Sequence, residues 1–359
     1  MGTLVFILVL SVLVMVHEYG HLLMAKALGV KVERFAFGFG PKLVSFIRKG
    51  TEYAICLIPL GGYVKMAGDE RAAYKGEKDE FFSKPIGHRA LIVLSGPVVN
   101  YLFAFACFCV VFMIGYPARS TVIGEVIKGY PVEQQGLLKV GDKIVSIDAV
   151  KMESWENIQE HISQAKKEQF VFGIERGDTR QTVTLNSVAD TTKNVFGQTI
   201  NVRRVGIAPN EEVVLLKYGF LTSVAKAGAK ILTITATTYK ALYLMLTGAM
   251  SAKEGVTGPI GIFFIISRAA ELGFSYVVYI MAVISASLAI FNLLPLPVLD
   301  GGHLLFFAVE KVRRKPLSEK TEEVIYRLGF SLIIALAVFV FYSDFARYGI
   351  LDKIMYWKH

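Results

Sequence analysis

The residues best suited to do chemistry are the two histidines and the glutamate of the sequence HEYGH, which are His17, Glu18 and His21. On a helix, His17 and His21 lie one turn apart on the same face, where both imidazoles can bind one metal ion. Glu18 is then placed to hold a water molecule and to take a proton from it. Two imidazoles suit zinc, although the spacing alone leaves iron or another divalent ion open.

The position of this motif argues against two histidines on an ordinary surface helix. No Asp, Glu, Lys or Arg occurs in residues 1–17, and the apolar residues 22–25 follow the motif. Roughly 20 apolar residues cross a bilayer as a helix, so we expect these ionisable groups inside a membrane span. Ionisable groups at that depth cost about 2.5 to 3.5 kcal/mol each on insertion scales, and a bound cation offsets that cost.

A catalytic zinc ion usually has three protein ligands, and we expect Asp300 to be the third. Asp300 is the only acidic residue in a long apolar stretch, and Pro295 and Pro297 interrupt the helix just before it. A broken helix at membrane depth must satisfy its freed backbone groups with protein or with a water-filled cavity, and hydrolysis needs such a cavity. The alternatives are that Asp300 is a C-terminal helix cap at the interface, or that His303 is the ligand.

Asn292 lies in the same apolar stretch, where its side-chain amide needs partners. It is placed either to donate to the scissile carbonyl and its oxyanion, or to bond a neighbouring helix. Asn100 and the sequence Ser95-Gly96-Pro97 are interpreted instead as features of tight helix packing.

The elements that must position these residues are predicted by hydropathy and charge. Four stretches lack every charged residue and predict about four membrane spans: residues 1–17, 90–118, 272–299 and 328–343. Lys and Arg outnumber Asp and Glu in residues 26–89 and 310–327, which places these connections in the cytoplasm. The near-neutral residues 119–212 and both termini are then outside. Because the basic residues of this chain, net charge +9, are scattered beside apolar spans, a nucleic-acid partner is excluded.

The connecting segments have patterns of their own. Strand-like residues 51–58 and 63–66, punctuated by glycine and proline, predict a β-hairpin. Residues 213–250 predict a helix lying in the membrane interface, and residues 256–267 are too short to span. Residues 119–211 have short β-branched runs and one helical stretch, at 154–167, as expected of a small α+β domain.

The predicted fold is a polytopic α-helical membrane protein of about four transmembrane helices, with a membrane-associated β-hairpin and one extracytoplasmic α+β domain. The N-terminal half of the membrane domain takes residues 1–118, and the soluble domain takes residues 119–211. An interfacial and re-entrant segment follows at 212–270, before the C-terminal half of the membrane domain at 271–359.

The chain resembles the site-2 protease family, specifically the bacterial zinc metalloproteases of regulated intramembrane proteolysis that carry a PDZ domain. The matching motifs are HEYGH, GFGP (38–41), PLGGYVKMAGD (59–69), SGPVVN (95–100), GPIGI (258–262) and NLLPLPVLDGGH (292–303). HExxH alone is a weak signal, but its combination with NxxPxPxLDG is specific. The resemblance implies that His17, His21 and Asp300 bind Zn²⁺, that Glu18 is the catalytic base, and that Asn292 assists at the substrate carbonyl.

The resemblance also implies that the hairpin near residues 51–58 binds the unwound substrate as an added strand, and the alternative is an ordinary structural hairpin. The candidate substrate-binding residues are Ile55, Leu57, Gly61, Gly62 and Tyr63. A transmembrane helix hides its peptide bonds and must become extended to be cut. The soluble block resembles a single PDZ domain, which either binds a peptide beside the helix at 154–167 or admits only substrates whose outer part is already trimmed.

The function implied is an intramembrane zinc metalloprotease of the bacterial inner membrane. It cleaves single-span proteins after a site-1 protease has cut them outside, and family substrates include membrane-bound anti-sigma factors and remnant signal peptides. A catalytically silent membrane scaffold with a PDZ domain is the alternative, which intact metal-binding and catalytic residues disfavour. A metal-ion transporter would need more than one intramembrane cluster of acidic or histidine residues, and the sequence shows one.

Overall fold

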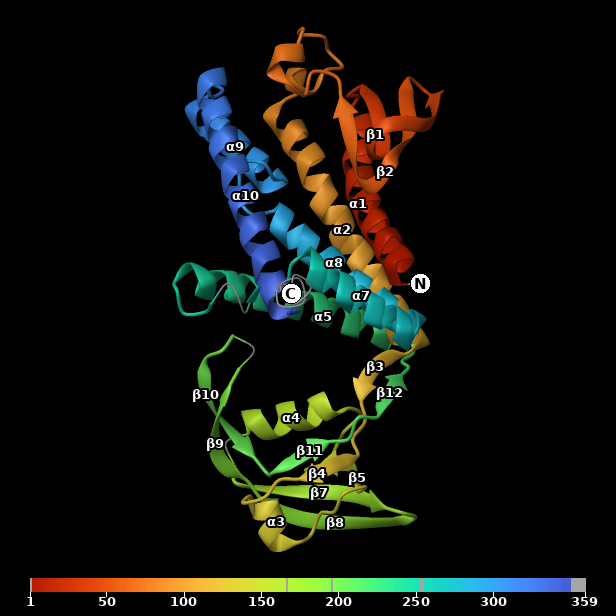
Figure 1. Ribbon diagram of the computed structural model, residues 1–359, viewed down its shortest axis with the longest axis vertical. Coiled ribbons are helices and arrows are strands. Elements are labelled where there is room, and N and C mark those ends of the chain that lie inside the picture. The colour runs from red at the N-terminus through yellow and green to blue at the C-terminus, as the bar shows by residue number, and fades with distance from the viewer. Residues whose placement is uncertain (1, 166, 195, 252–254, 350–359) are drawn as a thin grey trace, which may run out of the picture. The chain divides into compact units, whose positions relative to one another are not determined.

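The computed structural model describes residues 2–165, 167–194, 196–251 and 255–349. The chain divides into two compact units, which are described separately (Figure 1). The helical unit comprises Met1–Val110, Val224–Leu242 and Ala252–His359, and the β-rich unit comprises Val111–Ser223 and Tyr243–Ser251.

The long helices account for most of the helical unit. They are α1 (Gly2–Ala27), α2 (Ile86–Ile114), α5 (Phe220–Leu246), α7 (Pro259–Leu272), α8 (Phe274–Asn292), α9 (Asp300–Arg313) and α10 (Glu319–Arg347). Among the described residues, α1, α2, α8 and α10 are long and apolar enough to cross a membrane. The predicted polytopic helical fold is therefore confirmed. Val9 and Leu13 of α1 pack with Ile266 of α7 in a buried cluster, so α7 supports α1 without being long enough to span.

One helix boundary differs from the prediction, and one predicted helix break is observed. Helix α10 begins at Glu319, well before the charge-free stretch, because the Ser318 hydroxyl accepts a hydrogen bond from the Thr321 N–H and caps the helix. The helix break expected at Pro295 and Pro297 is present, since α8 stops at Asn292 and α9 starts at Asp300. Asp300 therefore stands in the first turn of a helix, and its alternative role as a C-terminal cap is wrong.

The predicted hairpin is formed by β1 (Val32–Arg48) and β2 (Thr51–Met66), which are antiparallel. Lys49 and Gly50 connect them, and both have positive φ, as a two-residue type I′ turn requires. Two short 3₁₀ turns, η1 (Arg71–Ala73) and η2 (Phe81–Ser83), lead from β2 to α2.

Both hairpin strands bend, so the first half of each strand pairs with both halves of the other. Ala36 pairs with Tyr63 on one side and with Ala54 on the other, and Tyr53 pairs with both Phe35 and Phe46. The result is a curled sheet in which residues 32–37 and 51–55 are inner segments, while 62–66 and 44–48 lie at its edges.

The β-rich unit is built around one four-stranded antiparallel sheet in the order β6-β5-β7-β8. The strands of this unit are β3 (Tyr116–Arg119), β4 (Ile123–Val126), β5 (Lys143–Ile147), β6 (Val150–Lys151), β7 (Gln169–Arg176), β8 (Thr179–Asn186), β9 (Val188–Lys193), β10 (Thr199–Arg204), β11 (Ile207–Pro209) and β12 (Val213–Leu216). Its helices include α3 (Pro131–Gln135) and α4 (Trp155–Gln164), and the Ser154 side chain caps α4 by accepting a hydrogen bond from the Asn157 N–H. Phe170, Phe172 and Trp155 lie in its buried core.

The start of the expected interfacial helix is instead a strand. Residues 213–216 form β12 and pair with β3, so the helix α5 begins only at Phe220. Exposed and half-buried residues alternate along β12, as in a half-buried strand. A short apolar run of this kind is compatible with either a strand or a helix, so the sequence alone does not distinguish them.

Candidate active site

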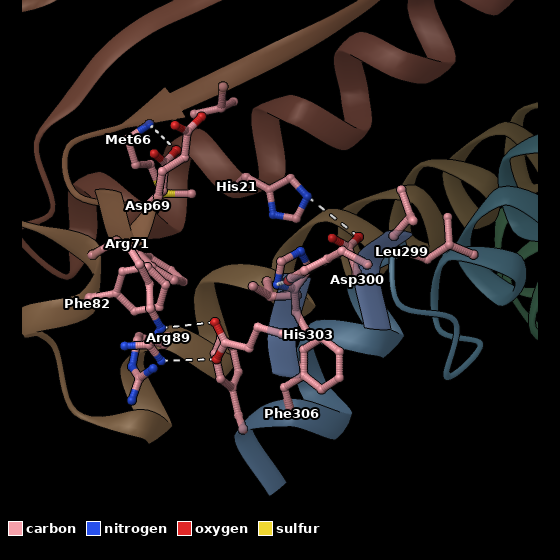
Figure 2. Close-up of a pocket in the computed structure, with 18 of the residues that line it drawn as sticks. His21, Met66, Asp69, Arg71, Phe82, Arg89, Leu299, Asp300, His303 and Phe306 are labelled. Carbon is pink, nitrogen blue, oxygen red and sulfur yellow. Dashed lines mark hydrogen bonds and ion pairs between the residues drawn. The ribbon is translucent and has the colours of Figure 1, made fainter. Parts of the chain in front are cut away.

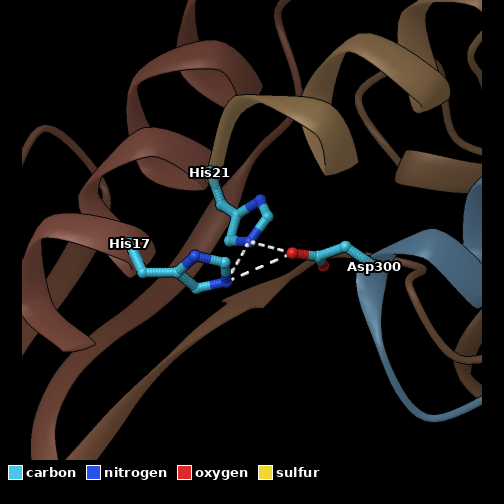
Figure 3. A group of neighbouring side chains, drawn as sticks. All are labelled: His17, His21 and Asp300. Atoms are coloured by element: carbon cyan, nitrogen blue, oxygen red, sulfur yellow. Dashed lines mark hydrogen bonds and ion pairs between the residues drawn. The ribbon is translucent and has the colours of Figure 1, made fainter. Parts of the chain in front are cut away.

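Three side chains from opposite ends of the chain meet in the helical unit (Figure 3). Nε2 of His17 lies 3.2 Å from Nε2 of His21, and Oδ2 of Asp300 lies 3.2 Å from the former and 3.6 Å from the latter. These atoms are all within 4.8 Å of one another, which is close enough for one metal ion to bind all three. The two histidines are brought together by the helical repeat of α1, and α9 supplies the carboxylate.

His21 is held in the orientation that a metal ligand needs. Its Nδ1 lies 2.9 Å from the carbonyl oxygen of Ile92 on α2, so Nδ1–H donates to that oxygen and Nε2 presents its lone pair toward Asp300. This contact depends on a close approach of α1 and α2. A Cβ at Gly20 would lie 2.5 Å from the Ser95 carbonyl oxygen, and a Cβ at Gly96 would lie 2.4 Å from Nε2 of His21.

The residues after Asp300 explain how a helix can begin at this depth. Gly301 and Gly302 are buried. A Cβ at Gly301 would lie 2.2 Å from the Leu294 carbonyl oxygen, and a Cβ at Gly302 would lie 2.1 Å from the Leu296 carbonyl oxygen. The loop that contains the two prolines therefore folds directly over the start of α9, which only glycine permits. The sequence DGG thus positions the carboxylate as well as supplying it.

The surroundings fit a divalent cation. Oδ2 of Asp300 is buried and accepts no hydrogen bond from the described residues, although it faces two imidazole nitrogens. Leaving a buried carboxylate oxygen without a partner is costly, and a cation shared with the imidazoles removes that cost. Two imidazoles and one carboxylate are also a ligand set of catalytic zinc sites.

Glu18 and Asn292 lie beside this cluster. Glu18 lines the same cavity as the three side chains, and strand β2 passes next to it, since a Cβ at Gly62 would lie 3.7 Å from the Cγ of Glu18. The amide nitrogen of Asn292 lies 3.5 Å from Nδ1 and 3.4 Å from Nε2 of His17. Both predicted residues are therefore within reach of a substrate held at the cluster.

A cavity of about 770 Å³ opens on the three side chains (Figure 2). Val64 and Met66 line one part of it, and Asp69, Arg71 and Glu322 line another. Arg71 donates two hydrogen bonds to Glu322, at 3.0 and 3.1 Å, so this ion pair forms part of the wall. An apolar and charged cavity of this volume has room for an extended peptide segment and for water.

His303, the competing ligand, is not part of the cluster of three. It lines the cavity, where its Nδ1 lies 3.1 Å from the hydroxyl of Tyr326. Asn100, which the sequence suggests is a packing residue, has its amide nitrogen 3.3 Å from Nδ1 of His17. The signal available in the sequence was a polar side chain one helical turn after Gly96 in a charge-free stretch.

The predicted substrate-binding residues have different environments. Ile55 belongs to an inner segment, pairs with Phe37 and Val44, and has no free edge for a substrate strand. Ile55 is therefore not suited to pair with a substrate strand, because strand addition needs unpaired backbone groups, whereas Cys56 and Ile58 each pair on one side only. Leu57 is 56% exposed.

The other predicted substrate-binding residues adjoin the second edge of the sheet. Gly61 has a positive φ of 91°, where β2 bends. Gly62 and Tyr63 follow in the edge segment 62–66, which leads to the cavity-lining Val64 and Met66. The hydroxyl of Tyr63 accepts a hydrogen bond from Arg34 at 3.1 Å.

Comparison with known proteins gives the class. The model of peptidase family M50 matches residues 5–336, and the chain belongs to this family. A protein of Mesorhizobium japonicum named as a zinc metalloprotease is 34% identical, in an alignment that covers 96% of this chain and 98% of that protein. The Regulator of sigma E protease of Haemophilus influenzae is 29% identical, covering 95% of this chain and 98% of that protein. The chain is thus a multi-pass membrane zinc metalloprotease of family M50.

One comparison with solved structures concerns a quarter of the chain. The PDZ domain of the SdrC-like protein from Listeria monocytogenes aligns with a TM-score of 0.20 and 20% sequence identity. The alignment covers 25% of this chain and 87% of that domain.

Proposed function

We infer that this metalloprotease cleaves peptide bonds inside the transmembrane segments of single-span proteins. The observation that carries the inference is the position of the cluster. His17 and His21 lie on α1, a helix long and apolar enough to cross a membrane, and they face a cavity that begins at the cluster. A peptide bond reaching them would therefore come from within the bilayer.

His17, His21 and Asp300 would hold the zinc ion that the family uses. When bound there, zinc supplies Lewis-acid activation of the scissile carbonyl and of a water molecule. Glu18 takes a proton from the attacking water while the oxygen of the water bonds to the carbonyl carbon of the substrate. The same carboxyl then gives the proton to the leaving amine as the C–N bond breaks, and Asn292 donates its amide N–H to the oxyanion that develops on the substrate.

The sheet edge at 62–66 is suited to hold the substrate. A substrate helix must unwind before its peptide bonds can be attacked, and an unwound segment in lipid needs partners for its backbone N–H and C=O groups. Within the described residues, segment 62–66 pairs only with residues 32–37, and Val64 and Met66 line the cavity. On the other side of this segment the Met66 N–H donates to Oδ2 of Asp69 at 2.9 Å, so an added strand beside Glu18 would pair with the remaining backbone groups of that side.

The remaining features of the proposal concern substrate choice and location. The enzyme resides in the bacterial inner membrane and acts after a site-1 protease, with trimmed anti-sigma factors or remnant signal peptides as the substrate class. The β-rich unit contributes a PDZ domain, outside the cytoplasm, that binds peptide or screens the trimmed end. Lys and Arg excess in residues 26–89 and 310–327 supports this orientation.

Incubation of the detergent-purified chain with a tagged single-span peptide tests the proposal. Wild type should cleave within the membrane segment of the peptide, as located by mass spectrometry, and a chelator should stop the reaction. Glu18→Gln should leave the peptide intact while the protein keeps its zinc. Cleavage only outside the apolar segment, or normal turnover by Glu18→Gln, would contradict the proposal.

A further inference from the structure

The two histidines of the cluster differ in what holds their outer nitrogen. Nδ1 of His21 donates to the backbone carbonyl of Ile92, as described above. Nδ1 of His17 faces no backbone carbonyl among the contacts of the described residues, and two side-chain amides approach the ring instead: Asn100 at 3.3 Å and Asn292 at 3.5 Å. The orientation of His17 therefore depends on one of two asparagines.

Geometry favours Asn100. The two imidazole nitrogens form hydrogen bonds along directions that lie in the ring plane and diverge. One atom therefore cannot form a well-aligned hydrogen bond with both nitrogens. The amide nitrogen of Asn292 is almost equally far from Nδ1 and Nε2, at 3.5 and 3.4 Å, and so lies over the ring or beside Cε1. Asn100 contacts Nδ1 at 3.3 Å and is in a position to meet the outer nitrogen alone.

Chemistry determines which atom of the amide must face the ring. If His17 binds a metal through Nε2, its proton is on Nδ1 and needs an acceptor. With the Asn100 amino group toward the ring, Oδ1 is buried and has no hydrogen-bond partner. Rotating the side-chain amide by half a turn exchanges its oxygen and its nitrogen. Oδ1 then accepts a hydrogen bond from Nδ1–H of His17, and two donors no longer face each other.

The backbone around Asn100 is fixed in place. The residue is fully buried, and its own carbonyl oxygen accepts a hydrogen bond of 2.9 Å from the hydroxyl of Ser285 on α8. Gly96, one turn earlier on α2, leaves the space for both imidazole rings, because a Cβ there would lie 2.4 Å from His21 and 2.7 Å from His17. One face of α2 thus adjoins both histidines.

We propose that Asn100 is a positioning residue for His17: its amide oxygen accepts the Nδ1–H and directs Nε2 to the metal. The role rests on the proposed function, because it requires a metal at the cluster. It assigns Asn100 to orientation of a ligand and leaves Asn292 free for the substrate. Partners of this kind typically change metal affinity by about 10- to 100-fold when removed.

Zinc affinity of the detergent-purified full-length chain tests the role without reference to turnover. Zinc is titrated against a chromophoric chelator in wild type, Asn100→Leu, Asn100→Asp and Asn292→Leu. Asn100→Leu, similar in size but without an acceptor, should bind zinc about 10- to 100-fold more weakly. Asn100→Asp keeps an acceptor and should bind at least as tightly as wild type. Asn292→Leu should stay within about threefold of wild type, since its amide does not hold the ligand.

Several outcomes decide the matter. Wild-type zinc affinity in Asn100→Leu, or a loss in Asn292→Leu as large as in Asn100→Leu, overturns the role. If Asn100→Leu does not fold, as judged by gel filtration and thermal unfolding of the metal-free protein, Asn100→Asp decides: a loss of about tenfold or more overturns it. Absence of a metal at the cluster is recognised separately, because then His21→Ala would bind zinc as wild type does, whereas failure of the proposed function appears as intact peptide in the cleavage assay with wild-type zinc affinity.

Discussion

Arg89 on α2 and Glu310 on α9 form a bidentate ion pair, with hydrogen bonds of 3.1 and 2.7 Å (Figure 2). The pair is well shielded, since the two side chains are 6% and 16% exposed. The guanidinium also lies 5.0 Å from the ring centroid of Phe307. Because α9 begins with Asp300 and α2 provides the carbonyl that orients His21, this ion pair connects the two helices that must hold the metal ligands in register.

Removing one member of the pair should destabilise the protein. Arg89→Leu leaves the largely shielded Glu310 carboxylate without its bidentate partner and should lower the free energy of unfolding by about 3 kcal/mol, the lower end of the range for buried pairs. The double variant Arg89→Leu/Glu310→Leu should recover most of that loss, because no charge remains unpaired. Thermal unfolding in detergent measures both effects. A double variant no more stable than Arg89→Leu would show that the ion pair is not the cause.

A methyl group at Gly96 should damage the metal site. The Cβ in Gly96→Ala would lie 2.4 Å from Nε2 of His21, closer than real Cβ contacts allow, so the imidazole must move. We expect zinc affinity to fall by about tenfold or more, even though alanine favours a helix by about 0.5 to 1 kcal/mol. Gly87→Ala on the same helix is the control, because a Cβ there meets nothing within 4 Å. Equal zinc affinity in both variants would contradict the crowding seen at Gly96.

Much of the site could be predicted because its chemistry is local or rare. His17 and His21 are one helical turn apart in sequence, and Asp300 stands out as an acidic residue in an apolar stretch, so residue type and hydropathy sufficed to select all three. The four long apolar helices follow from the charge-free stretches in the same way. These features need no knowledge of how the helices pack.

What the sequence could not predict depends on packing and on strand register. Asn100 adjoins His17 only because Gly20 and Gly96 bring α1 and α2 together, and no periodicity specifies that approach. Ile55 became an inner residue of the sheet because β1 and β2 bend at their glycines and pair twice, which a hairpin pattern does not encode. Pairing with β3, distant in sequence, likewise made β12 a strand.

The identity of the third ligand can be tested against its neighbour. Asp300→Asn replaces a charged oxygen donor by a neutral one and should lower the zinc content of the purified protein by about tenfold or more at limiting zinc. His303→Ala should leave the zinc content unchanged, because Nδ1 of His303 is engaged with Tyr326 and His303 is not in the cluster. Atomic absorption on the metal-equilibrated variants makes the comparison. The reverse result would assign the third position to His303.

A pH-dependent contribution to stability is expected in the β-rich unit, at Asp148. Burial raises the pKa of this carboxyl, but hydrogen bonds from Lys167 and His161 outweigh it and hold the pKa at about 2, below its usual value of 3.8. Its oxygens lie 2.7 Å from the Lys167 ammonium, 3.0 Å from the His161 ring and 3.1 Å from the Val171 N–H. The carboxylate thus joins the loop after β5 to α4 and β7.

Because the pKa of Asp148 is lower in the folded than in the unfolded protein, its stabilising effect is complete above pH 3.8 and is lost as pH falls toward 2. Trp155, buried in the core of the β-rich unit, reports unfolding of this unit by fluorescence once the second tryptophan is removed by Trp357→Phe. Denaturant midpoints should therefore fall between pH 4 and pH 2 in the full chain. Asp148→Asn, which tolerates the positive φ of 54° at this position, should lose stability at pH 4 and show a smaller fall over the same interval. An equally large fall in Asp148→Asn would assign the acid sensitivity to other carboxyl groups.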